Sequence, residues 1–496
     1  MSNHATPSEP ILLGDKALVR LDPRVSVPLY DRRALRHAIV HIGVGGFHRA
    51  HLATYVDELC SAGNTSWGIV GSGVLPSDRR MADVLNRQDA LYTLITRSAD
   101  ETAVRVIGSI VDYMHASPET GSLIRRIAHP DTRIVSLTLT EGGYPVDEET
   151  RRFDFSAALA GPNSAFGIIV AALEHRQRQG VGPLSVVSCD NVIGNGDVAR
   201  TATLGVAEER SPKLRNWIEG AVPFPNSMVD RITPATTDAD RDWLAQEYGI
   251  ADGWPVVSEP FRQWVIEDSF EGDRPPWEEV GVTVTSDVEP YELMKLRLLN
   301  AGHSCMAYLA ALAGIERVDS AMAESRIDRF LRRFLESEAG PVLPDIPGID
   351  VPAYMASLLE RFSNPAMGDQ ISRLCLDGSA KFPKFLLPTV RAQLARGGPI
   401  DLSALALAGW CAYLVGVADN GAAISHATDP DLETARSYAA SSAKDPSNFL
   451  AYRSVFGDDL PLEPRFVKAF GSALRSLRSV GVRSTLDTVL RPGRGR

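Results

Sequence analysis

Short apolar runs alternate with stretches of helical spacing over the first part of the chain. Phe47–Ser61 and Ser164–Gln179 repeat apolar residues every three to four positions, which predicts helices. The apolar runs, each short enough for one strand, are Ala38–Ile42, Trp67–Val70, Arg105–Ile110, Arg133–Thr138, Leu184–Cys189 and Gly281–Thr285. Strands that alternate with helices in this way predict an α/β fold with a doubly wound, mostly parallel sheet.

After Pro290 the strand-like runs almost disappear and helical periodicity dominates. The predicted helices are Tyr291–Ala313, Ala321–Glu336, Val351–Phe362, Ile371–Leu376, Phe385–Arg396, Leu402–Ala418, Asp431–Ser441 and Pro464–Val480. The stretch Leu402–Ala418 carries no charge, but it is short for a membrane span and contains several small residues, so we interpret it as a buried helix. We therefore place a domain boundary near residue 290.

Composition narrows the class of protein. The chain has 496 residues, a net charge of −11 and 44% hydrophobic residues, which is typical of a globular protein and disfavours nucleic-acid or anionic-membrane partners. Its five cysteines are scattered and form no CxxC pair, which argues against a disulfide framework and favours a reducing compartment. The first ten residues lack the pattern of a secretory signal. We expect a cytoplasmic protein.

A glycine-rich turn follows the first predicted strand. Its residues Gly43, Val44, Gly45, Gly46 and Phe47 contain the first two glycines of a dinucleotide-binding fingerprint, which let the backbone approach a pyrophosphate at a helix start. The place of the third glycine is taken by a histidine. Many strand-to-helix turns contain glycine, so an ordinary turn is the alternative interpretation. With the dinucleotide interpretation, residues 1–290 form a Rossmann-like domain, with residues 1–37 as an extended lead-in.

The choice between NAD and NADP is not settled by spacing. The fingerprint expects an acidic residue at the end of the second strand. This region reads Val70-Gly71-Ser72-Gly73, and Asp78 follows only later, with Arg79 and Arg80 behind it. An arginine here would suit a 2′-phosphate.

Two histidines, His48 and His51, lie three residues apart just after the glycine turn. A metal site is one interpretation of this spacing. No third ligand with fitting spacing is evident, so we expect no metal.

The predicted helix after Pro290 carries four polar residues on one arc. With Lys295 at zero and about 100° per residue, Glu292 falls near 60° and His303 near 80°. Asn300 falls at about 140°. Such a cluster is either a hydrogen-bonded seam or the lining of a cleft. In a cleft, desolvation would lower the pKa of Lys295 toward that of a general base, and Asn300 would stabilise a developing oxyanion.

The sequence resembles the polyol-specific long-chain dehydrogenases over almost the whole chain. The segments that carry the resemblance are Gly43–His51, Thr138–Tyr144, Ser188–Asn191, Pro225–Pro234, Glu259–Asp268, the helix with Lys295, Asn300 and His303, Arg361–Pro365 and Asp377–Pro383. The resemblance implies an NAD- or NADP-dependent oxidoreductase that needs no metal and transfers a hydride at a secondary alcohol. It also implies a helical substrate-binding domain over residues 291–496 and a monomer.

The resemblance also implies roles for individual residues. Lys295 is then the general base, and Asn191 and Asn300 form the oxyanion hole. The remaining implied roles are positioning of the reacting hydroxyl by His303 and Asp230, proton transfer to solvent by Glu292, binding of distal hydroxyls by Arg373 and Lys381, and cofactor binding by the glycine turn with Glu141. We place Asp230 in a loop-like segment and Asn191 just beyond the strand Leu184–Cys189, where α/β sheets bind ligands.

Several substrates fit this family. We favour the interconversion of D-mannitol and D-fructose with NAD, because Gly71-Ser72-Gly73 is like the segment of the mannitol-oxidising members. The alternative is D-mannonate and D-fructuronate, whose carboxylate Arg373 or Lys381 would bind. Arabinitol and sorbitol are further alternatives, and a nucleotide-binding sensor without turnover is the alternative outside the enzymes.

Overall fold

The computed structural model describes residues 9–147, 150–154, 161, 163–425 and 428–491. Part of the predicted lead-in lies outside these ranges. The chain forms two compact units, Met1–Glu289 and Pro290–Arg496, which are described separately.

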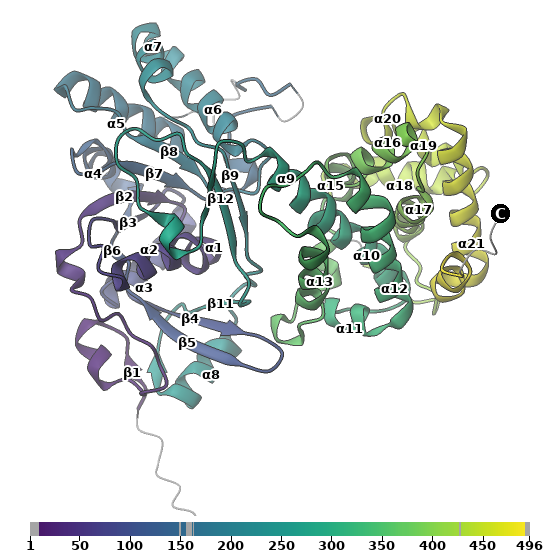
Figure 1. Cartoon of the computed structure of the whole chain (residues 1–496), viewed down its shortest axis with the longest axis horizontal. Coiled ribbons are helices and arrows are strands. Elements are labelled where there is room, and N and C mark those ends of the chain that lie inside the picture. Colours follow the sequence, from purple (N-terminus) through teal and green to yellow (C-terminus); the bar gives the residue numbers. More distant parts are fainter. Residues whose placement is uncertain (1–8, 148–149, 155–160, 162, 426–427, 492–496) are drawn as a thin grey trace, which may run out of the picture. The chain divides into compact units, whose positions relative to one another are not determined.

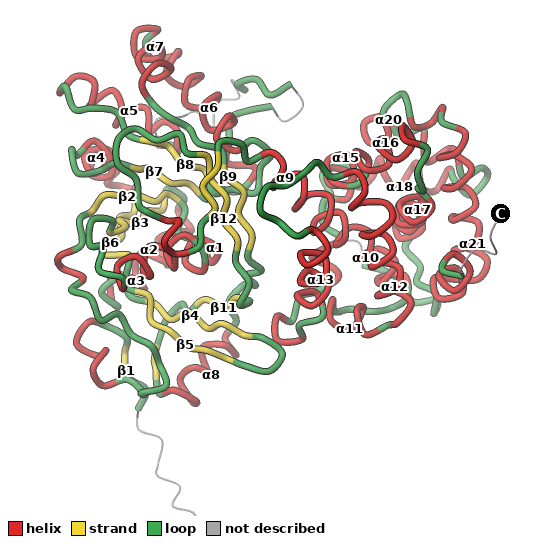
Figure 2. The backbone as a smooth tube through the Cα atoms, viewed as in Figure 1, coloured by secondary structure: helices red, strands yellow, loops and turns green. Residues whose placement is uncertain are grey.

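The first unit is built on a five-stranded parallel sheet (Figures 1 and 2). Its strands, in spatial order, are β6 (Ile110–His115), β3 (Gly68–Gly73), β2 (His37–Ile42), β7 (Ile134–Leu137) and β8 (Ser185–Ser188). From β2 the chain proceeds to β3 and β6 on one side and then to β7 and β8 on the other. The order therefore reverses between β2 and β7, where open α/β sheets bind their ligands. The predicted doubly wound sheet is confirmed.

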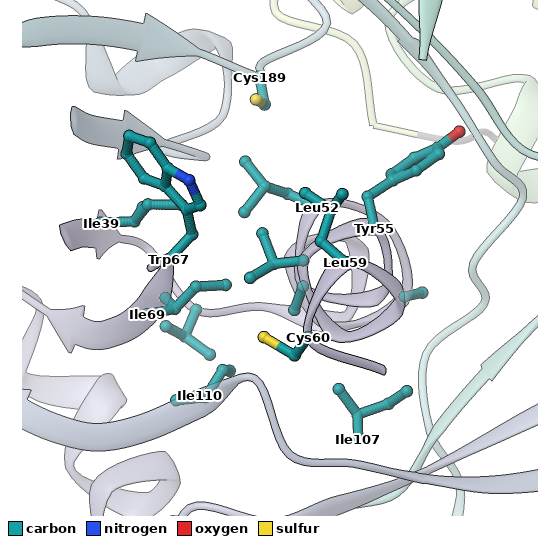
Figure 3. Packing of buried hydrophobic residues seen from close by; sticks show 14 of the residues in the cluster. Ile39, Leu52, Tyr55, Leu59, Cys60, Trp67, Ile69, Ile107, Ile110 and Cys189 are labelled. Atoms are coloured by element: carbon teal, nitrogen blue, oxygen red, sulfur yellow. The ribbon is translucent and has the colours of Figure 1, made fainter. Parts of the chain in front are cut away.

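Helices bury both faces of this sheet. Alternate residues of β2 point to opposite sides, so Ile39 belongs to one core cluster while Val40 and Ile42 belong to the other. The first face is covered by α1 (Gly46–Ala50), α2 (Leu52–Ser61) and α3 (Arg79–Arg87), and the second by α4 (Ala116–Ala128), α5 (Ala165–Gln179), α6 (Asn195–Arg210) and α7 (Pro212–Ala221). Figure 3 shows Leu52, Leu59 and Cys60 of α2 turned toward Ile39, Ile69 and Ile110.

Three smaller sheets complete the first unit. They are β11-β4-β5 (Val256–Ser258, Tyr92–Arg97, Thr102–Ile107), β13-β12-β9 (Thr283–Thr285, Gln263–Glu267, Ser227–Asp230) and the pair β1-β10 (Ile11–Leu12, Ile250–Ala251). The helix α8 (Asp238–Tyr248) lies between β9 and β10 in sequence.

Three local expectations for the first unit are wrong. Arg105–Ile110 is not one strand, because the chain turns at residues 108–109 and passes from β5 to β6, which belong to different sheets. Phe47–Ser61 is not one helix, because the non-helical backbone of His51 separates α1 from α2. Asp230 does not lie in a loop, because it ends strand β9 and pairs with Gln263 of β12.

The second unit is helical, as predicted. Its α-helices are α9 (Glu289–Lys295), α10 (Ala301–Leu312), α11 (Val318–Ala323), α12 (Ser325–Phe334), α13 (Val351–Phe362), α14 (Ile371–Leu374), α15 (Gly378–Phe385), α16 (Leu387–Arg396), α17 (Asp401–Val415), α18 (Leu432–Ser441), α19 (Ser447–Leu450), α20 (Arg453–Phe456) and α21 (Pro464–Val489). The uncharged stretch after Leu402 forms α17, whose side chains are almost all buried, so that prediction is confirmed. None of the helices in the described ranges has the length and apolar character needed to cross a bilayer.

The helix with Lys295 is not a continuous α-helix. A π-helical turn, Leu296–Asn300, separates α9 from α10. A π turn bonds residue i to i+5 and so inserts one extra residue into the helical repeat, and such turns are frequent at functional sites. The angles expected from an uninterrupted α-helix therefore need correction.

Candidate active site

The glycine turn lies at the point where the strand order reverses. Gly43 follows β2 directly and has a φ of 95°, which side chains rarely adopt. A Cβ atom on Gly43 would lie 2.2 Å from the carbonyl oxygen of Thr138, beyond the end of β7. The Thr138 hydroxyl donates a hydrogen bond of 2.6 Å to the Gly43 carbonyl. The ends of β2 and β7 thus approach so closely that only glycine fits at position 43. Gly45, two residues further on, is exposed.

His48 stands where the fingerprint would have its third glycine. Its ring stacks on the ring of His41 in β2, with the centroids 3.4 Å apart. Both rings are buried. Burial lowers the pKa of His41 to about 3 and holds the pKa of His48 well below its usual value, so both are neutral at pH 7. A neutral ring stack thus joins α1 to the sheet at the place where other dinucleotide folds use a glycine.

The end of β3 has an acidic side chain that sequence spacing did not place there. A Cβ atom on Gly73, the last residue of β3, would lie 2.8 Å from the Asp78 carboxylate. The loop folds back, and Asp78 accepts a hydrogen bond of 2.9 Å from the backbone N–H of Leu75. Arg80 packs over the Trp254 ring, 4.9 Å from its centroid. The carboxylate therefore lies against the last residue of β3, the strand end at which the fingerprint expects an acidic residue.

Asn191 lies just beyond the carboxyl end of β8 and is exposed. Its neighbour Asp190 is buried and accepts hydrogen bonds from the backbone N–H groups of Leu139, at 2.9 Å, and Thr140, at 2.8 Å. The Tyr144 hydroxyl donates to the same carboxylate at 2.5 Å. Burial raises the pKa of Asp190. This carboxylate ties the segment after β7 to the end of β8. The side chain of Glu141, in that segment, lies outside the described part of the structure.

A buried asparagine connects β8 with the strand of Asp230. Asn195 donates to the carbonyls of Asp190, at 3.0 Å, and Ser227, at 2.8 Å, and accepts from the Ser227 N–H. Ser227 begins β9, and Asp230, 5% exposed, ends it. The first unit therefore holds Asn191 and Asp230 on two segments that Asn195 joins. The sequence marks Asn195 only as a polar residue at a helix start.

In the second unit, the π turn narrows the polar arc. Lys295 is the last residue of α9 and only 8% exposed. Because one extra residue is accommodated, Asn300 falls at about 40° and His303 at about −20° from Lys295, instead of about 140° and 80°. Glu292 stays at about 60° because it precedes the π turn. The four polar residues therefore share a narrower stripe than an α-helix would give them.

The other two predicted substrate residues lie on helices that pack against α10, the helix of His303. The helices α14, with Arg373, and α15, with Lys381, both contact α10, and α15 also contacts the π turn. The ring of His303 stacks on Phe362 of α13, with centroids 4.0 Å apart. The segments that carry the predicted substrate residues thus belong to one packed unit. They are α9, the π turn, α10, α14 and α15.

Comparisons with known proteins show which family has this architecture. The "Mannitol dehydrogenase Rossmann domain" matches residues 37–279, and the "Mannitol dehydrogenase C-terminal domain" matches residues 287–478. The chain belongs to the mannitol dehydrogenase family. Curated relatives include mannitol 2-dehydrogenases of Phaeosphaeria nodorum, 44% identical with 96% of this chain and 85% of the relative covered, and of Aspergillus fumigatus, 43% identical with 93% and 95% covered.

Solved structures agree with this family assignment. The Pseudomonas fluorescens mannitol 2-dehydrogenase, determined as a ternary complex with NAD and D-mannitol, superposes with a TM-score of 0.87 at 43% identity, covering 97% of this chain and 100% of that one. A substrate-free D-sorbitol dehydrogenase superposes with a TM-score of 0.90 at 34% identity, covering 96% and 100%. The resemblance seen in the sequence is confirmed.

The histidines after the glycine turn have other contacts. His51 bonds to the carbonyl of Gln263 at 2.9 Å, and His48 stacks on His41. Among the described residues, no three histidine, cysteine, aspartate or glutamate side chains gather as metal ligands would.

Proposed function

We propose that the protein is an NAD-dependent oxidoreductase that interconverts D-mannitol and D-fructose. One observation carries the proposal: the chain matches, over 97% of its length and at 43% identity, an enzyme whose structure contains NAD and D-mannitol together. The family match over both units supports the same reaction.

The first unit is proposed to hold the cofactor. Gly43, whose missing side chain lets β2 and β7 meet, opens the turn Gly43–Phe47 that would carry the pyrophosphate, with Val44, Gly45, Gly46 and Phe47 and, from the segment after β7, Glu141. Asp78, which folds back against the end of β3, would accept hydrogen bonds from ribose hydroxyls and repel a 2′-phosphate, which favours NAD over NADP. NAD, when bound, accepts a hydride from the carbinol carbon.

The protein's own residues would manage the proton and the oxygen. Lys295 Nζ, on a residue only 8% exposed, would take the proton of the reacting hydroxyl, and Glu292 would pass that proton to solvent. Asn191 and Asn300 donate hydrogen bonds to the oxygen as it gains negative charge. The reacting hydroxyl is positioned by His303 and Asp230, and the distal hydroxyls by Arg373 and Lys381. With these groups the reaction needs no metal.

Sorbitol is the second candidate substrate, because a D-sorbitol dehydrogenase shares the fold over the whole chain. The proposal is tested by following NADH formation with D-mannitol, D-sorbitol, D-arabinitol and D-mannonate, each with NAD and with NADP. We expect the highest kcat/KM for D-mannitol with NAD. Cofactor binding without turnover of any of these compounds would contradict the proposal and would favour the alternative of a nucleotide-binding sensor. That the enzyme is a monomer and cytoplasmic stays a prediction.

A further inference from the structure

An aspartate that sequence reasoning did not select holds one of the proposed substrate residues. Asp369 lies in the loop just before α14, and its side chain is 11% exposed. Its carboxylate accepts two hydrogen bonds from Arg373, from Nε at 2.7 Å and from Nη2 at 2.5 Å. The backbone N–H of Gln370 donates to the same carboxylate at 2.9 Å, which fixes its orientation. Two parallel bonds between planar groups make this a rigid ion pair.

The pair is ionised but carries no net charge. Burial works to raise the pKa of Asp369, but the hydrogen bond and charge of Arg373, together with nearby His303, hold it below its ordinary value. The same hydrogen bond raises the pKa of Arg373. A negative and a positive charge are therefore fixed side by side at neutral pH. Arg373 Nη1 has no hydrogen-bond partner among the described residues, and the Arg373 side chain is 57% exposed, so one edge of the guanidinium still faces outward.

Such a pair suits a hydroxyl group better than a carboxylate. A hydroxyl accepts a hydrogen bond from Nη1 and donates one to a carboxylate oxygen. A ligand carboxylate has no proton to donate, and it meets the charge of Asp369 as well as that of Arg373. The attraction that a lone arginine would exert on an anion is thus largely cancelled.

We propose that Asp369 is a specificity-determining residue, which masks the charge of Arg373 and thereby selects uncharged polyols against aldonates. The inference rests on the proposed function, which sets Arg373 against the distal end of the substrate. D-Mannonate has the configuration of D-mannitol at the reacting end and differs by a carboxylate at the far end. Of the two carboxylate partners that the mannonate alternative allows, Arg373 or Lys381, the masked Arg373 would then be the weaker one.

The test removes the charge of Asp369 and keeps its shape. In Asp369→Asn, we expect the ratio of kcat/KM for D-mannonate to kcat/KM for D-mannitol to rise at least about tenfold, because Arg373 then presents a net positive charge. Lys381 is present in both proteins, so the change in this ratio reports on Arg373. Adding Arg373→Ala to Asp369→Asn removes the gain. The inhibition constant of D-mannonate against D-mannitol should fall in Asp369→Asn and return in the double variant.

A second ion pair of the same unit supplies the matched control. Arg317 Nε donates to Asp319 at 2.9 Å, and no substrate role is proposed for either residue. Asp319→Asn should leave the mannonate-to-mannitol ratio unchanged. If Asp369→Asn is too unstable to assay, Asp369→Ser takes its place.

The outcomes separate this inference from the function on which it rests. A folded Asp369→Asn enzyme that oxidises D-mannitol with an unchanged ratio would overturn the inference and leave the function intact. A gain that persists without Arg373 would overturn it equally. A wild-type protein that oxidises no polyol would instead overturn the proposed function.

Discussion

At the scale of single residues, Gly43 joins the sequence motif to the geometry of the crevice. Its φ of 95° and the 2.2 Å between its absent Cβ and the Thr138 carbonyl oxygen are two separate reasons for glycine. The chain offers a comparison, because Gly63 has almost the same φ, 97°, but nothing within 4 Å of its Cβ position. Gly63→Ala therefore measures the backbone cost alone.

We expect Gly63→Ala to lower the free energy of unfolding by about 1–2 kcal/mol through its backbone conformation. Gly43→Ala should cost roughly 1–3 kcal/mol more, because the methyl group forces the ends of β2 and β7 apart. It should also weaken NAD binding at least about tenfold, which Gly63→Ala should not. Urea unfolding and calorimetric NAD titration check this pair. Equal losses of stability in Gly43→Ala and Gly63→Ala, with unchanged NAD affinity in both, would show that the close approach at Gly43 matters neither for stability nor for NAD binding.

At the scale of elements, the parallel sheet was predictable because its strands are buried on both faces and appear as apolar runs. Pairings between distant segments were not predictable. The predicted strand Arg105–Ile110 is wrong because it spans a turn. Ser109 in that turn is fully buried, so burial does not distinguish the turn from the interior of a strand. The strand β9 has only four residues and takes its partner from β12, far along the chain.

The site was predictable to a similar extent. Lys295, Asn300 and His303 share a helix, so their spacing revealed that they belong together. The π turn between them contains neither proline nor glycine and left no mark in the sequence. Asp78 reaches the end of β3 only because the loop after that strand folds back. Asp369 forms its ion pair with Arg373 four residues on, a contact that spacing alone does not distinguish from an ordinary surface pair.

At the scale of the whole molecule, acid should destabilise the first unit, where His41, His48 and His51 are buried. Burial lowers the pKa of His41 and of His51 to about 3 and that of His48 well below its usual value. In the unfolded chain each histidine takes up a proton near its ordinary pKa of about 6.5. The unfolded state therefore binds more protons below that pH, and the stability that the neutral rings contribute is full above pH 6.5 and is lost as the pH falls toward 3.

Between pH 7 and pH 5.5 we expect a loss of about 1 kcal/mol for each of these histidines in the free energy of unfolding. The raised pKa of Asp190 works in the opposite direction. Tryptophan fluorescence during urea unfolding is a suitable readout, because all the tryptophans except Trp410 lie before residue 290. A urea midpoint that does not move across this pH range would contradict the prediction.

The central claim is that Lys295, buried at the start of the π turn, is the base of the reaction. The most direct measurement is kcat for D-mannitol oxidation by the wild type and by Lys295→Ala at neutral pH, with Lys468→Ala, an exposed position on α21, as the control. We predict a loss of at least about 100-fold in Lys295→Ala, which is typical of a missing general base, with NAD affinity and the Lys468→Ala rate unchanged. A folded Lys295→Ala enzyme that oxidises D-mannitol at the wild-type rate would contradict the account.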